Sequence, residues 1–205
     1  FILQHHKGET DDQLYVWVPG RKALASADYY QGFLPNAGNG KRSQRHVEEW
    51  SVAMKEMAAL NPQILLPAHG KEITEPAVIQ ENFLALAEAF DYIVNHTIDG
   101  LNAGKRKEQI FGSVQLPEHL ANHPSLNVQY VTPNDISKMV IKKYTGWWDD
   151  IPSNWTPASM EQQGNMIIEL AGGNIPAITS YARKLINQDI RLASHLTDWL
   201  FYARP

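Results

Sequence analysis

The spacing of apolar residues changes near residue 75, and this change limits what the chain can fold into. Before it, short apolar runs alternate with turn signals rich in Gly and Pro. After it, apolar residues recur three and four positions apart over long stretches. The first pattern is typical of strands and the second of helices with one buried face. The sequence therefore predicts an α/β region over residues 1–75 and an all-α region over residues 76–205.

The N-terminal region is predicted to contain a hairpin followed by a helix and a further strand. Residues 14–18 are aromatic and β-branched, Pro19-Gly20 indicates a turn, and residues 22–25 form a second short apolar run. A helix is predicted from Ser43, as its cap, to about Leu60, and residues 64–66 follow as a buried strand. A strand, helix, strand order of this kind favours the α/β class.

The C-terminal region is predicted to be helical with one aromatic interruption. Pro76 opens a long helix to about residue 103, and Pro133 opens another. Residues 144–157 form an aromatic loop, and three helices follow at about 157–171, 175–187 and 190–203. The domain boundary is placed near residue 75, or at the aromatic loop if the long helix packs on the first region.

Composition excludes several classes of function. The chain has 18 Lys and Arg against 22 Asp and Glu, a formal charge of −4, which disfavours broad binding to nucleic-acid phosphates. Cysteine is absent, so disulfides and thiolate ligands are excluded, and any metal must be held by His, Asp or Glu. No apolar run approaches the roughly 20 residues that a membrane-spanning helix needs.

Two carboxylates and one imidazole stand at the ends of predicted strands. Glu9 precedes the first strand of the hairpin, Asp28 follows the second, and His69 follows the third within Pro67-Ala68-His69-Gly70. Ligands gather at strand ends in α/β sheets, and this donor set suits Zn²⁺. Each residue alone is more often a turn residue or a helix cap, so the prediction rests on their combination.

These motifs together resemble the metallo-β-lactamase superfamily. Gly8-Glu9-Thr10 stands where that family has Gly-His-Thr, Asp28 stands at the position of its bridging Asp, and residues 67–70 match its Pro-x-His-Gly turn. The Glu in the first motif is similar to the alkylsulfatase (SDS-hydrolase) branch. Residues 144–152 and the final helices also resemble the helical dimerisation domain of that branch. The implied fold is the C-terminal half of an αββα sandwich followed by an all-α dimerisation domain.

The resemblance implies a metal-dependent hydrolase that cleaves alkyl sulfates or similar anionic esters and forms a homodimer. Two Zn²⁺ ions are expected per active site, with Glu9, Asp28 and His69 as metal ligands. The family motif His-x-His-x-Asp-His, with its water-activating Asp, does not occur in these 205 residues. No catalytic residue is therefore expected in this chain, and the apolar start at Phe1 leads us to expect the C-terminal piece of a longer protein.

Substrate contacts are implied at four further positions. Arg42, or Lys41, takes the place of the family's sulfate-binding Arg, and Asn134 is what remains of a His-Asn pair. Trp147 is expected to line an alkyl-chain slot, although such tryptophans more often belong to a core or an interface. The alternative reading is a helical assembly module of a superfamily hydrolase that acts on a different ester, lactone or phosphoester.

Overall fold

A four-stranded sheet forms the N-terminal part of the molecule in the computed structural model, which describes residues 1–203. Its strands are β1 (Ile2–His5), β2 (Leu14–Val18), β3 (Ala23–Ala27) and β4 (Ile64–Pro67), in that spatial order. β1 and β3 are antiparallel to β2, and β4 is parallel to β3. The predicted hairpin is confirmed: a short 3₁₀ turn, η1 (Pro19–Arg21), joins β2 to β3.

Six helical segments complete the first of two compact units, Phe1–Asp150. They are α1 (Val47–Ala59), α2 (Pro76–Asn102), α3 (Lys107–Gly112), α4 (Glu118–Ala121), η2 (Pro124–Leu126) and α5 (Pro133–Thr145). The predicted mixed α/β character is therefore confirmed. The long helix α2 packs on α1, so this compact unit extends beyond residue 75. The division into a catalytic-type domain at 1–75 and a dimerisation domain at 76–205 stays a prediction.

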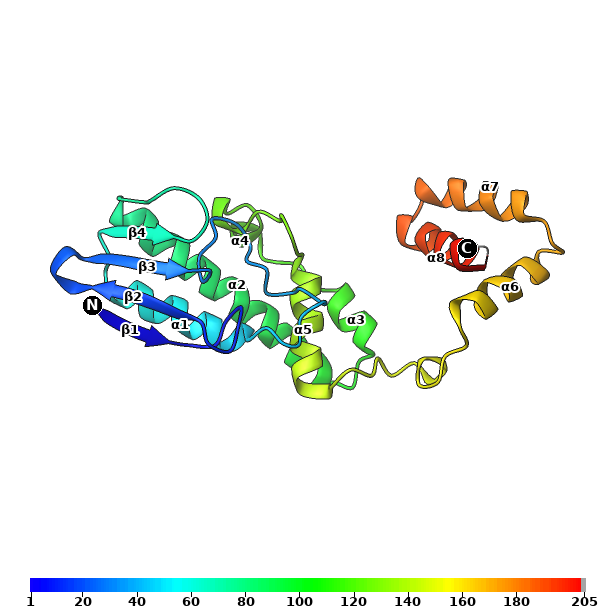
Figure 1. Cartoon of the computed structure of the whole chain (residues 1–205), viewed down its shortest axis with the longest axis horizontal. Helices are drawn as coiled ribbons and strands as arrows, with labels where there is room; N and C mark the ends of the chain where they lie inside the picture. Colours follow the sequence, from blue (N-terminus) through cyan, green and yellow to red (C-terminus); the bar gives the residue numbers. More distant parts are fainter. Residues whose placement is uncertain (204–205) are drawn as a thin grey trace. The chain divides into compact units, whose positions relative to one another are not determined.

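One face of the sheet builds the core with α1 and α2 (Figure 1). Side chains alternate along each strand, and the inward set includes Trp17, Leu24 and Leu65. Trp50 of α1 is fully buried, and its ring meets that of Phe90 of α2 edge-on at 5.5 Å between centroids. Aromatic pairs of this kind stabilise a core beyond the area that they bury.

The opposite face of the sheet is apolar and partly exposed. One row of paired residues crosses all four strands: Leu3, Val16, Ala25 and Leu66. Leu3 is 65% exposed and Leu66 is 43% exposed. Exposed apolar patches of this kind mark surfaces that pack against another layer or partner.

The helix α1 starts at Val47, four residues later than predicted, and Ser43 is not its cap. His46 is the N-cap residue and makes no side-chain cap. Its backbone N–H donates to the carbonyl of Gly8 at 3.0 Å. Residues 43–46 therefore remain a connection that contacts the loop after β1, and this tertiary contact outweighs the local capping preference of Ser43.

The loop before α1 also packs against the start of α5. A Cβ atom at Gly38 would lie 2.6 Å from the backbone of Asp135, so only glycine fits this approach. Thr132 and Asp135 form a capping box at this helix start. In the second turn of α5, the Ser137 hydroxyl forms a buried 2.7 Å hydrogen bond with the Thr97 hydroxyl of α2. The Gly38 contact holds α5 against the loop before α1, and the Ser137 hydrogen bond holds it against α2.

The second compact unit, Ile151–Pro205, contains η3 (Pro152–Asn154) and the helices α6 (Met160–Leu170), α7 (Ile175–Ile186) and α8 (Ile190–Ala203). α8 packs on both α6 and α7, and the indole N–H of Trp199 donates to Gln163 at 3.2 Å. Many apolar side chains of this unit stay exposed, among them Leu170, Ile186 and Phe201. In the described part of the chain, no helix combines the length and apolar character that a membrane span requires.

Candidate metal and anion site

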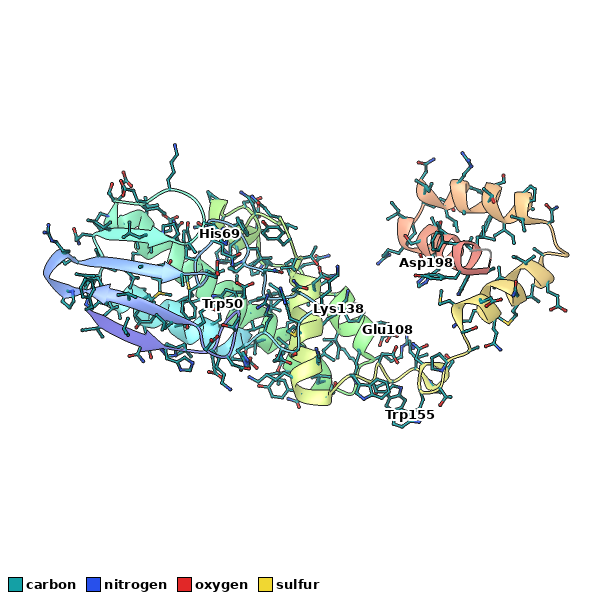
Figure 2. The ribbon with its side chains drawn as sticks, in the orientation of Figure 1. Trp50, His69, Glu108, Lys138, Trp155 and Asp198 are labelled. Carbon is teal, nitrogen blue, oxygen red and sulfur yellow. The ribbon has the colours of Figure 1, made fainter. Side chains whose placement is uncertain are left out.

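The strand ends bring Asp28 and His69 together. β3 and β4 are parallel, and the register pairs Ala27 with Pro67, so the residues that follow both strands emerge at the same edge. Ala27 has a positive φ of 46°, which turns the chain sharply at the end of β3. Nε2 of His69 lies 2.9 Å from Oδ1 of Asp28. Figure 2 shows His69 in the loop beyond β4.

Glu9 reaches the same edge from the loop between β1 and β2. Its carboxyl group interacts electrostatically with the Asp28 carboxylate and with His69. Burial raises the pKa of Glu9 above its ordinary value; the Arg45 guanidinium opposes this shift and the Asp28 carboxylate adds to it. The three residues predicted from the sequence thus lie in one cluster, although their role as metal ligands stays a prediction.

Tyr29 fixes the loop that contains Glu9. Its side chain is fully buried, and its hydroxyl donates to the carbonyl of His6 and lies 3.0 Å from that of Gln13. The same oxygen accepts the backbone N–H of His6 at 3.1 Å. Because Tyr29 directly follows Asp28, this residue ties the end of β3 to both ends of the Glu9 loop.

The chemistry of the cluster fits a divalent cation. Two adjacent carboxylates and one imidazole are oxygen and nitrogen donors of the kind that Zn²⁺ accepts. Oδ1 of Asp28 is buried and has no hydrogen-bond partner in residues 1–203, despite its ionic contact with His69. Within the same residues, no group of three or more His, Asp or Glu is arranged so that it could hold a metal ion. The role of this cluster in metal binding therefore stays a prediction.

Arg45 is the site residue that the sequence did not reveal. Its side chain is 4% exposed, donates to the backbone carbonyl of Glu9, and places Nη2 2.7 Å from Oε1 of the same residue. Burial lowers the pKa of Arg45, while the Glu9 carboxylate raises it. The only sequence signal was the density of basic residues at positions 41, 42 and 45. A buried charge needs such a partner, so Arg45 and Glu9 hold each other in place.

Arg42 lies next to this cluster and Lys41 faces a separate hollow. Arg42 lines a pocket of about 470 Å³ together with Glu9 and Arg45. Lys41 lines a neighbouring pocket of about 480 Å³, with Tyr130 and Asp135 among its walls. Of the two basic residues predicted as substrate contacts, Arg42 is thus the one that shares a pocket with Glu9.

The other two predicted substrate contacts lie elsewhere in the first unit. Asn134 is half-buried in the first turn of α5, beside Asp135. Trp147 is 70% exposed after the end of α5 and lines a third pocket. That pocket and the one with Glu9 and Arg42 have no lining residue in common. The substrate role of all four residues stays a prediction.

Comparison with known proteins finds similarity to alkylsulfatases. Residues 106–205 match the alkyl sulfatase dimerisation family. A linear primary-alkylsulfatase of a Pseudomonas species is 24% identical over 95% of this chain and 38% of its own length. An alkyl/aryl-sulfatase of Saccharomyces cerevisiae is 21% identical over the whole of this chain and 32% of its own length. The chain therefore spans about a third of the length of the curated relatives that it matches.

A solved structure confirms the similarity of the fold. The stereoselective inverting sec-alkylsulfatase of a Pseudomonas species matches 97% of this chain and 32% of its own chain, with a TM-score of 0.86 at 20% identity. The predicted resemblance is thus confirmed: the chain is similar to the alkylsulfatases along nearly its whole length, and residues 106–205 match the alkyl sulfatase dimerisation family.

Proposed function

We propose that this chain supplies part of the metal site of a metallo-β-lactamase-type hydrolase that cleaves alkyl sulfates. The observation that carries the proposal is the convergence of Glu9, Asp28 and His69 from three strand ends. Alkylsulfatase relatives support the substrate class, because their names state this activity. The apolar outer row from Leu3 to Leu66 supports the idea that this sheet is one layer of an αββα sandwich.

Glu9, Asp28 and His69 would hold zinc together with ligands from outside this chain. When bound, zinc is a Lewis acid that lowers the pKa of a coordinated water to about 7. Asp28 would hold zinc through its carboxylate, beside the imidazole of His69. Arg45 would keep the Glu9 carboxylate oriented through its two contacts with that residue. The catalytic acid–base groups are expected outside these 205 residues.

The basic residue Arg42 would bind the sulfate group of the substrate. A guanidinium donates parallel hydrogen bonds to two oxygens of a tetrahedral anion, which a lysine ammonium does not match in geometry. Arg42 shares its pocket with Glu9, so an anion held there would lie beside the proposed metal ligands. Lys41 and Asn134 would contribute to the same end of the substrate, whereas Trp147 lines a separate pocket.

The test is an activity assay of the complete gene product with and without a zinc chelator. We expect hydrolysis of dodecyl sulfate that the chelator abolishes and that Asp28→Ala reduces by at least a hundredfold. Phosphoesters, lactones and thioesters serve as competing substrates. Turnover of these substrates alone would reject the alkylsulfatase assignment, and chelator-resistant turnover would reject the metal mechanism.

The alternative function, an assembly module, has its own support. Residues 106–205 match a family described as a dimerisation domain, and the second unit exposes apolar residues such as Ile186, Leu192 and Phe201. Contiguous exposed apolar surface favours association. We therefore propose a homodimer whose contacts include this unit. Sedimentation that shows a monomer at micromolar concentration would reject the dimer, whatever the activity assay shows.

A further inference from the structure

A pocket of about 410 Å³ lies in the first unit between α3, α5 and residues 146–149. Its walls include three lysines and three aromatic residues: Lys107, Lys138, Lys142, Phe111, Trp147 and Trp148. We call it the lysine–aromatic pocket. None of Glu9, Asp28, His69, Arg42 or Arg45 lines it. Its volume falls within the range of small-molecule sites, about 300–1,000 Å³.

The charged side chains of this pocket favour an anion. Three lysines and one acidic residue, Asp149, line the pocket. Asp150 pairs with Lys107 and Asp135 pairs with Lys138 from outside the lining, so Lys142 contributes positive charge beside these pairs. Lys138 and Lys142 are four positions apart on α5 and therefore lie on the same face of that helix. Figure 2 labels Lys138 on the part of α5 near α3. Two ammonium groups on one face can bind one anionic group together.

The existing partners of these lysines leave Lys138 and Lys142 able to bind a ligand. Lys107 is nearly buried, donates to the carbonyl of Trp148, and lies 3.4 Å from Oδ2 of Asp150, so its role is structural. Lys138 forms an exposed ion pair with Asp135, a kind of contact that contributes little to stability. Lys142 donates to the backbone carbonyl of Arg42 at 3.0 Å.

The aromatic walls favour an apolar body on the same ligand. The ammonium of Lys138 lies 4.8 Å from the ring centre of Phe111, so charge and aromatic surface are adjacent. Trp147, which is 70% exposed, and Trp148 provide further apolar surface in the same pocket. An inorganic anion would contact the lysines alone, whereas an amphiphilic anion would use both parts of the pocket.

We propose that the lysine–aromatic pocket binds a small amphiphilic organic anion, with its anionic group at Lys138 and Lys142 and its apolar body against Phe111 and Trp147. The proposal does not rest on the metal site, because the two sites share no lining residue. It assigns a second ligand site to the molecule, distinct from the pocket that contains Glu9 and Arg42.

The test uses 1-decanesulfonate, below its micelle concentration, in isothermal titration of the complete gene product. A sulfonate has a carbon–sulfur bond and no ester, so it cannot be hydrolysed as a sulfate ester. We expect Lys138→Gln and Lys142→Gln each to weaken binding about tenfold, as expected for loss of a charged hydrogen-bond donor. Lys143→Gln is the matched control, because Lys143 lies on the same helix but pairs with Glu48.

Four outcomes separate the possibilities. Binding that Lys143→Gln leaves unchanged, and that Asp28→Ala also leaves unchanged, supports the proposal. Equal weakening by Lys143→Gln would show general surface attraction and overturn it. Equal affinity for decyltrimethylammonium, which has the same chain and the opposite charge, would show an apolar patch only and overturn it. Loss of binding in Asp28→Ala would place the anion at the cluster of Glu9 and Asp28, and would also overturn it.

Discussion

Replacing Tyr29 with phenylalanine should loosen the loop that contains Glu9 without changing any proposed ligand. The lost hydroxyl donates to the carbonyl of His6 and lies 3.0 Å from that of Gln13. It also accepts the N–H of His6 at 3.1 Å. The ring is fully buried, and the bond to Gln13 is buried as well. Leaving a buried polar group without a partner costs about 1–3 kcal/mol of unfolding free energy.

The same change should also weaken metal binding. Groups that orient a metal ligand without touching the ion typically change affinity by about 10–100-fold. Tyr30→Phe provides the matched control, because the Tyr30 hydroxyl is also buried and hydrogen-bonded, to Ser125 at 3.1 Å and to Asn82 at 2.9 Å. We expect both variants to lose similar stability in urea unfolding. Only Tyr29→Phe should lose zinc affinity in a competition titration with a chelating dye.

The refuting result follows from this pair of variants. If Tyr29→Phe loses stability as Tyr30→Phe does but binds zinc as tightly as the wild type, then the hydroxyl does not position Glu9. If Tyr29→Phe loses no stability, the buried hydrogen bonds at His6 and Gln13 do not contribute as the structure indicates.

Three further predictions concern charge, capping and packing. With a chelator present to remove metal, the raised pKa of Glu9 adds to the free energy of unfolding below pH 4.5, and this added stability is lost as pH rises through the raised pKa. Thermal melts of Glu9→Gln, measured across the same pH range, should not show this loss. Thr132→Ala removes the α5 cap and should cost about 0.5–2 kcal/mol in urea unfolding, with equal stability contradicting the capping role. Gly164→Ala would place a Cβ against the Trp199 carbonyl oxygen and should lower the free energy of unfolding of the second unit by about 1–3 kcal/mol. Thermal melting followed by helix circular dichroism measures this loss, and an unchanged melting temperature would contradict the packing of α6 on α8.

Local patterns predicted much of the fold. The hairpin, the strand before His69 and the long helix from Pro76 follow from apolar spacing and from turn residues, which act over a few positions. The start of α1 was predicted wrongly at Ser43. There, the backbone contact of His46 with Gly8 decides the structure, and a pattern of neighbouring residues does not contain that contact.

In the candidate site, too, local patterns predicted some residues, and contacts between distant parts of the chain decided others. Glu9, Asp28 and His69 were accessible from sequence because each lies beside a recognisable strand and because their motifs together resemble those of the metallo-β-lactamase superfamily. Arg45 was not, because its partner Glu9 lies 36 residues away and a basic residue in a polar loop is usually solvated. The role of Tyr29 was also hidden, since a tyrosine after a strand carries no signal of the loop that its hydroxyl will bind.

The most direct test of the central claim is the zinc content of the purified complete gene product. After removal of free metal, we predict about two zinc equivalents in the wild type and loss of zinc in Asp28→Ala. His119→Ala is the control, because His119 is an exposed residue that pairs with Glu88, and it should retain the wild-type content. A wild type without zinc, or an Asp28→Ala variant with full zinc, would contradict the claim that Glu9, Asp28 and His69 belong to a metal site.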